Sequence, residues 1–69
     1  MQPHQERVVA EKKELDEKLA KLSLFMTGIA FANLPAGEKD RLFRQEDVMK
    51  EYSGILGERI AAFGDTEKG

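Results

Sequence analysis

Cysteine and tryptophan are absent from this sequence, and histidine and tyrosine occur once each. Without cysteine, the chain forms neither a disulfide framework nor a thiolate metal site. The single histidine, His4, lies near the amino end and has no second imidazole with which to hold a metal ion or share acid–base catalysis. We therefore expect no metal site, no cofactor and no enzymatic activity.

A long apolar run and an excess of one charge are also missing. The 11 basic and 13 acidic residues give a formal net charge of -2, so no uniform basic field attracts a nucleic-acid duplex. The longest apolar run, residues 24–32, is shorter than the roughly 20 residues that span a bilayer, and the amino end has no signal-peptide pattern. These absences predict a soluble cytoplasmic protein that binds neither membranes nor DNA.

The chain is small for an independent domain. A domain of 69 residues buries only roughly 60% of its unfolded surface, so its core is marginal. Because disulfides and metal ions are excluded, oligomerisation is the remaining way to stabilise this core. The apolar fraction of 41% and the charged fraction of 35% are typical of long helices with mixed charges on their exposed faces.

Apolar residues in the second half of the chain recur with a helical period. Leu42, Met49, Leu56 and Phe63 stand at every seventh position, and further large side chains flank that line on both sides. One partner helix cannot cover so wide a stripe, so we expect a second helix of the same chain and another subunit. The predicted interface between copies consists of Val48, Ile55, Leu56, Ile60 and Phe63.

The first half has a narrower apolar line, or seam, whose spacing is that of the a and d positions of a helix packed along one side. It consists of Val8, Leu15, Leu19, Leu22, Met26 and Ile29. Gln5 and Lys12 occupy seam positions, so the amino-terminal third is expected to be the looser end. Gly28 leaves two alternatives: the helix stops near Thr27 and a short helical turn follows, or it continues to about Asn33. In both cases a cluster at the bend should close the hairpin, formed by Phe25, Ile29, Phe31 and Leu34.

These patterns predict an all-α fold: an antiparallel helical hairpin with a short helical turn at the bend, assembling into a homo-oligomeric helix bundle. The single domain, 1–69, has helix 1 at about 4–27, the turn at 28–33, a connector at 34–37 and helix 2 at about 36–63. Gly64 is placed to end helix 2, and residues 64–69 are expected to form a polar tail.

Basic residues on helix 2 are the candidate binding group. Gln45, Tyr52 and Arg59 lie a heptad apart and form a polar edge beside the apolar stripe. Guanidinium groups bind phosphates and stack on bases, so this edge could hold a small nucleotide at a junction between copies. Alternatively, the same side chains form interhelical hydrogen bonds that set the register of a bundle. The candidate ligand-binding residues are Lys39, Arg41, Arg44, Gln45, Tyr52 and Arg59.

Spaced Leu, Phe, Gln, Met, Tyr and Arg positions recur in residues 22–26, 31–34, 42–45 and 49–52, with Leu56, Arg59 and Ile60. These positions resemble those of short phage-encoded helical hairpins, the crAss-phage-related small protein family. The likeness covers residues 11–63, and Gly54 and Gly57 depart from it because helix-forming residues would be expected there.

The resemblance implies a function by analogy of architecture. Several phage hairpins of this size assemble into oligomers that sequester the cyclic nucleotide signals of bacterial defence systems such as CBASS and Thoeris. By that analogy the chain is a counter-defence protein that sequesters such a signal in the host cytoplasm. Its arginines and Lys39 would bind phosphates, Tyr52 would stack on a base, and Gln45 would hydrogen-bond to a base edge or hold an arginine in place. The alternative is an interaction module whose second helix binds and inhibits or scaffolds a host or phage protein.

Overall fold

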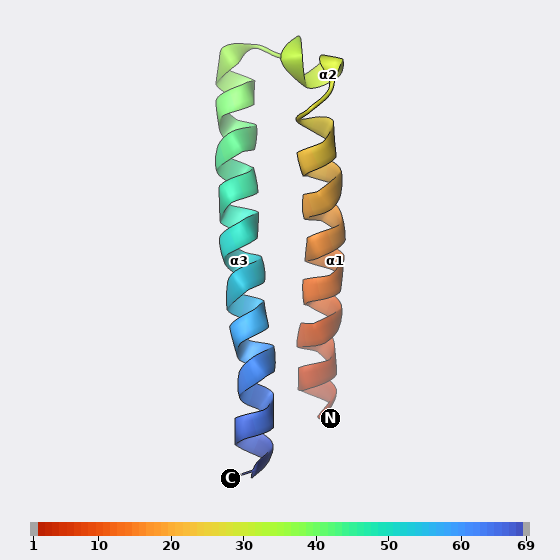
Figure 1. Ribbon diagram of the computed structural model, residues 1–69, viewed down its shortest axis with the longest axis vertical. Coiled ribbons are helices and arrows are strands. Elements are labelled where there is room, and N and C mark those ends of the chain that lie inside the picture. The colour runs from red at the N-terminus through yellow and green to blue at the C-terminus, as the bar shows by residue number, and fades with distance from the viewer. Residues whose placement is uncertain (1, 69) are drawn as a thin grey trace.

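The computed structural model describes residues 2–68 of the chain, with side chains described for residues 2–64. Its helices are α1 (Pro3–Phe25), α2 (Ile29–Ala32) and α3 (Ala36–Lys68). The long helices α1 and α3 run side by side in opposite directions, α2 closes one end, and both termini lie at the other end (Figure 1). The structure thus confirms the predicted all-helical hairpin, whereas assembly of several copies stays a prediction.

The amino end of α1 begins with a hydrogen-bonded cap. The backbone N–H of Gln2 donates to Oε1 of Gln5 at 2.8 Å, and Pro3 takes the first helical position, where no amide donor is needed. Gln5 and Val8 are both buried. Gln5, which was expected to loosen this end, is therefore hydrogen-bonded to the backbone of Gln2, and it supports the start of the helix.

A break separates α1 from α2 at Gly28. The N–H groups of Thr27 and Gly28 donate to the carbonyls three residues earlier, each at 3.1 Å, which tightens the last turn of α1. Gly28 then has an extended backbone and is the N-cap residue of α2. Of the two predicted alternatives, the structure shows the early stop, with α1 ending at Phe25.

Three phenylalanines fill the closed end of the hairpin. The buried ring of Phe31 stands edge-on to Phe25 and to Phe43, with ring centroids 6.3 Å and 5.4 Å away. The prediction that Ile29 belongs to this cluster was wrong, because its side chain is 80% exposed. Ile29 and Phe31 are two residues apart on a single helical turn and so point in nearly opposite directions, and Phe43 of α3 fills the cluster instead.

Helix α3 starts after Pro35, whose carbonyl accepts the N–H groups of Glu38 and Lys39 at 3.0 Å. It passes through Gly54 and Gly57 without a break and continues beyond Gly64, its predicted end, as far as Lys68. No glycine in the described part of the chain has a positive φ, so Gly64 does not form the left-handed cap that would stop a helix. The predicted tail is helical over residues 64–68, and Gly69 lies outside the described residues.

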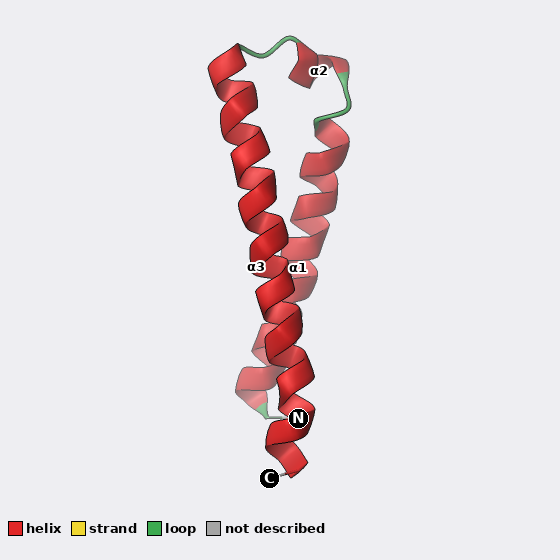
Figure 2. Ribbon diagram, turned by 60° about the vertical axis from the view of Figure 1, so that its left-hand side comes forward, coloured by secondary structure: helices red, strands yellow, loops and turns green. Residues whose placement is uncertain are grey.

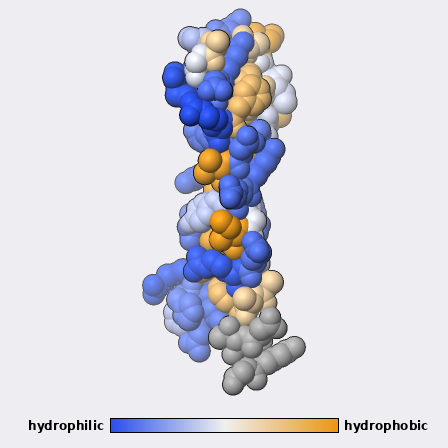
Figure 3. Space-filling view, turned by 90° about the vertical axis from the view of Figure 1, so that its left-hand side faces the viewer, coloured by the Kyte–Doolittle hydropathy of each residue, from blue (hydrophilic) through white to orange (hydrophobic). Residues whose placement is uncertain are grey.

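The interior is small. Val8, Phe31 and Leu56 are the buried apolar residues within the described part of the chain. The hairpin measures 52 × 15 × 14 Å, and its two long helices cross in the lower half of the view in Figure 2 and stand apart near α2. On the outward side of α3, apolar patches lie among hydrophilic side chains (Figure 3). Among the described helices, none has a stretch apolar enough to cross a lipid bilayer.

Candidate ligand-binding site

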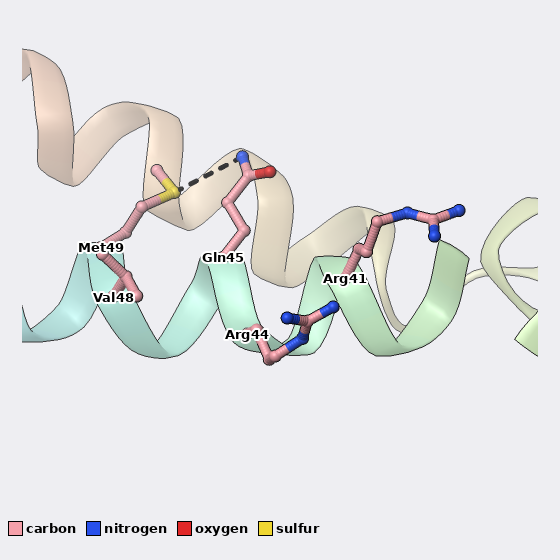
Figure 4. Close-up of a pocket in the computed structure, with 5 residues that line it drawn as sticks. All are labelled: Arg41, Arg44, Gln45, Val48 and Met49. Atoms are coloured by element: carbon pink, nitrogen blue, oxygen red, sulfur yellow. Dashed lines mark hydrogen bonds between the residues drawn. The ribbon is translucent and has the colours of Figure 1, made fainter. Parts of the chain in front are cut away.

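A shallow hollow lies on the surface of α3, with a volume of about 410 Å3. It is lined by Arg41, Arg44, Gln45, Val48 and Met49, and we call it the arginine hollow (Figure 4). The two guanidinium groups lie toward the bend, and the apolar side chains lie on the next turn of the same helix. Three of the six predicted binding residues therefore share one site: Arg41, Arg44 and Gln45.

Both arginines of the hollow form ion pairs along their own helix. Nε of Arg41 donates to Oε1 of Glu38 at 2.9 Å, and Nε of Arg44 lies 3.1 Å from Oδ2 of Asp40. All four side chains are solvent-exposed, and exposed pairs of this kind contribute only about 0–1 kcal/mol. A phosphate group, which accepts two parallel guanidinium hydrogen bonds, can therefore replace these carboxylates at small cost.

Gln45 and Val48 present different chemistry to the hollow. The Gln45 amide and the Met49 sulfur lie on the side of α3 nearer α1, where Nε2 of Gln45 is 3.9 Å from Sδ of Met49 (Figure 4). Val48 and Arg44 lie on the other side, and the Val48 side chain is 64% exposed. The hollow thus combines cationic groups, one amide and an apolar surface.

Tyr52 lies on the same flank of α3, one turn beyond Val48. Its hydroxyl donates a hydrogen bond to Oε2 of Glu11 on α1. This bond, together with desolvation and the negative charge of Glu11, raises the pKa of Tyr52 above its ordinary value of 10.0, while the charge of Arg59 acts in the opposite direction. The ring is exposed but tethered across the hairpin, so its face has a defined position beside the hollow.

Lys39 and Arg59 lie away from the hollow. Two residues along a helix correspond to a turn of about 200°, so Lys39 lies on the opposite side of α3 from Arg41. Arg59 follows Arg44 by about 22 Å along the helix axis, at 1.5 Å per residue. Within one copy, these two cations do not meet the hollow, and their part in binding stays a prediction.

The predicted interface residues divide into three groups by their exposure. Val48 and Ile55 are 64% and 47% exposed, as an interface between copies requires. Leu56 is 0% exposed, so it belongs to the core between α1 and α3, and its predicted place between copies is corrected. Ile60 and Phe63 are half-buried, and the Phe63 ring stands edge-on to His4 at 6.4 Å between centroids.

A polar cluster that the sequence did not predict lies between α1 and α3. Nζ of Lys12 donates to Oδ2 of Asp16 at 2.7 Å and to Oγ of Ser53 at 3.2 Å, and the Ser53 hydroxyl donates to Oδ1 of Asp16. The bonds from Lys12 and from Ser53 hold the pKa of the Asp16 carboxyl below its ordinary value of 3.8. The seam position of Lys12 was the available signal, but its partner on α3 is distant in the sequence.

A further hydrogen bond joins α1 to α3 nearer the bend. The Ser23 hydroxyl donates to Oε2 of Glu46 at 2.6 Å, and Nζ of Lys50 lies 3.7 Å from the other oxygen of that carboxylate. No buried side-chain nitrogen or oxygen lacks a hydrogen-bond partner in the part of the chain that the structure describes. The polar groups of the α1–α3 seam are therefore satisfied within the hairpin.

Comparison with known proteins yields one family. The model of the Sequestin family matches residues 2–62. No curated protein and no solved structure matches the chain. The resemblance to phage hairpin proteins stays a prediction, because the match gives the name of the family and does not say whether its members come from phages.

Proposed function

We propose that this chain, which belongs to the Sequestin family, binds a small anionic nucleotide at the arginine hollow and sequesters it without chemical change. The family name is consistent with sequestering a molecule. The observation that carries the proposal is the pair of exposed guanidinium groups, Arg41 and Arg44, beside an apolar surface on one helix.

The chemistry of the hollow suits the parts of a nucleotide. The guanidinium groups of Arg41 and Arg44 supply paired donors for phosphate oxygens. Val48 and Met49 supply apolar surface for a base, and the Gln45 amide can donate to or accept from a base edge. Arginine, glutamine, valine and methionine are not the side chains that act as nucleophiles or general bases at neutral pH, which supports binding without catalysis.

The nucleotide that we propose is a cyclic signal of a bacterial defence system, and the chain would be a phage counter-defence protein. This follows the resemblance to phage hairpins that sequester such signals. A protein of this kind acts by stoichiometric binding, because every bound molecule lowers the free concentration of the signal.

Calorimetric titration against cyclic dinucleotides, cyclic trinucleotides and cyclic ADP-ribose isomers tests the proposal. We expect saturable binding of at least one ligand, and chromatography of the ligand after the protein is denatured should recover it unchanged. Arg44→Ala should weaken binding by about 10- to 100-fold, because hydrogen bonds to charged groups contribute about 1.5–3 kcal/mol. Lys21→Ala, which removes an exposed cation of α1, is the matched control and should bind normally.

Absence of heat across the whole panel would overturn the proposal. The competing function, a helical module that binds a host or phage protein, predicts that result. Recovery of a hydrolysed ligand would overturn the statement that binding leaves the nucleotide unchanged.

A further inference from the structure

The closed end of the hairpin carries large apolar side chains that the fold leaves exposed. Leu24, near the end of α1, is 73% exposed, Phe25 is 42% exposed, and Ile29 on α2 is 80% exposed. We call these three residues the apolar tip. Because α2 lies at the end opposite both termini, the apolar tip occupies one end of a rod 52 Å long (Figure 1).

The charges of the chain are distributed unevenly about this end. Residues 22–37 contain no charged side chain, although such side chains make up 35% of the sequence. Around this stretch, residues 18–44 contain five basic and two acidic residues, whereas the rest of the chain contains six basic and eleven acidic residues. The hairpin is therefore positive around the bend and negative toward its termini.

Lysine residues lie directly behind the apolar tip. The exposed Lys21 precedes Leu24 by three residues, or about 4.5 Å along α1, and Lys18 lies one further turn back. Lys39 follows the first residue of α3 by the same three residues. Lysine side chains are long and flexible, so their ammonium groups can reach toward the tip. The order along the rod is thus apolar side chains first and cations next.

The backbone of the bend is largely hydrogen-bonded within the chain. The hydroxyl of Thr27 donates to the carbonyl of Leu24 at 2.7 Å. Backbone N–H groups donate to backbone carbonyls at 3.0–3.2 Å from Met26, Thr27, Gly28, Ala32, Asn33 and Leu34. Peptide groups that keep internal hydrogen bonds lose little when water is removed from them. The bend can therefore enter an apolar environment without losing its fold.

We propose that the apolar tip docks end-on into the surface of an anionic lipid bilayer, with Lys18, Lys21 and Lys39 at the lipid phosphates and the acidic end of the hairpin pointing away. Peripheral segments bury their apolar side chains about 5–10 Å into the boundary between headgroups and acyl chains. At that depth, cations one or two helical turns behind the tip reach the phosphates. Each basic residue near an anionic surface strengthens the attraction, and the acidic half avoids it by its distance.

An acidic protein is the other class of partner that such charges would attract. A bilayer fits better, because the tip is the projecting end of a rod and a fluid surface adapts to it, whereas a protein would need a matching groove. The prediction that the chain binds no membrane rested on the short apolar run at 24–32, which matters for spanning a bilayer. Docking on its surface needs no such run.

Sedimentation with lipid vesicles tests the proposal on the natural chain. We expect the protein to sediment with vesicles of equal parts phosphatidylcholine and phosphatidylglycerol, and much less with vesicles of phosphatidylcholine alone. Equal sedimentation with both kinds of vesicle would overturn the proposal. Failure to sediment with either would also overturn it and would leave a protein as the partner of the tip.

Two matched pairs of variants locate the surface that binds. Ile29→Ser should weaken binding to the anionic vesicles by about tenfold or more, because a large apolar side chain no longer enters the lipid. Val9→Ser, at an exposed position toward the other end of α1, should bind like the natural chain. Circular dichroism checks that both variants remain helical. Unchanged binding by Ile29→Ser would overturn the proposal.

The second pair reverses one charge at two distances from the tip. Lys21→Glu should weaken binding by about fivefold or more, because it replaces an attracted charge by a repelled one. Lys13→Glu changes the net charge equally, but it lies about 16 Å from Leu24 along α1, beyond the Debye length of about 8–10 Å, and should have little effect. Equal losses in both variants would show a response to net charge alone and would refute end-on docking.

A fluorescent label reports the orientation directly. Because the natural chain has no cysteine, Ile29→Cys and Val9→Cys each introduce a single thiol for an environment-sensitive dye. We expect the emission of the dye at position 29 to shift to the blue when anionic vesicles are added, and the dye at position 9 to remain in water. A blue shift at position 9 without one at position 29 would overturn the proposal. The apolar tip belongs to α1 and α2 and the arginine hollow to α3, so these outcomes do not depend on nucleotide binding.

Discussion

Lys12 is a charged residue at a seam position, and its surroundings explain how the hairpin accommodates it. Its ammonium group contacts Asp16 on its own helix and Ser53 on α3. A methyl group added at Gly57 would lie 3.4 Å from Cε of Lys12, so the glycine leaves room for the aliphatic part of the side chain. Polar partners matched across a seam contribute little net stability, but they favour one register over others.

The Asp16 carboxyl gives this cluster a dependence on pH. Its pKa in the folded chain lies below the ordinary value of 3.8, so its ionised form stabilises the fold above that value, and the contribution is lost as the pH falls through the folded-state pKa. We expect the difference in melting temperature between the natural chain and Asp16→Asn to be largest near neutral pH and to shrink as the pH falls below 3.8, the ordinary pKa of the carboxyl. Circular dichroism melting over this range measures it.

Asp47→Asn provides the control for that measurement, because Asp47 is an exposed carboxylate of α3. Its difference from the natural chain should stay small at every pH. If the Asp16→Asn difference stayed constant down to pH 2, the lowered pKa of Asp16 would be refuted as a source of stability.

At the scale of elements, α3 is continuous although it contains two interior glycines. Gly54 and Gly57 both keep helical geometry, and neither has a positive φ. Contacts with α1 through the buried Leu56 stabilise this part of α3, whereas a glycine by itself lowers helix stability by about 0.5–1 kcal/mol relative to alanine. Packing therefore overrides a local preference for interruption.

The two glycines differ in their surroundings, and alanine substitution should reveal the difference. A Cβ at Gly54 would meet nothing within 4 Å, so Gly54→Ala should stabilise the fold by about 0.5–1 kcal/mol. Gly57→Ala should gain less, because its methyl group meets the Lys12 side chain at 3.4 Å. Urea denaturation of both variants measures the two free energies. A loss of stability in Gly54→Ala would contradict the open surroundings of this residue.

At the scale of the whole molecule, one hairpin hides little apolar surface. Val8, Phe31 and Leu56 are its buried apolar residues within the described part of the chain, and Val48 and Ile55 face outward. Small domains with so few buried side chains usually need cross-links, metal ions or association, and this chain has no cysteine. Folding and association should therefore be coupled.

Coupling makes the melting temperature depend on protein concentration, because dilution favours the separated chains. We expect the melting temperature to rise over a hundredfold increase in concentration and to become nearly independent of it in Val48→Glu, which places a charge among the exposed apolar residues of α3. Circular dichroism in cells of different path length measures both proteins. A melting temperature that is constant for the natural chain would show that the hairpin folds alone.

The sequence by itself determined the two long helices and which residues share the flank of the arginine hollow. Helical periodicity depends only on residues three to seven positions apart, so Arg41, Arg44 and Gln45 could be placed together, and Val48 and Ile55 could be placed on the outer side of α3. The break near Gly28 was recognised as one of two alternatives, because a glycine lowers helix stability without deciding where the chain goes next.

Only the tertiary structure decided which residues of α1, α2 and α3 contact one another. It moved Leu56 into the hairpin core, replaced Ile29 by Phe43 in the aromatic cluster, and joined Lys12 to Ser53. It also extended α3 past Gly64. The places of Leu56, Phe43 and Lys12 depend on contacts between residues that are far apart in the sequence, and the pattern within one helix contains no information about the helix that covers it.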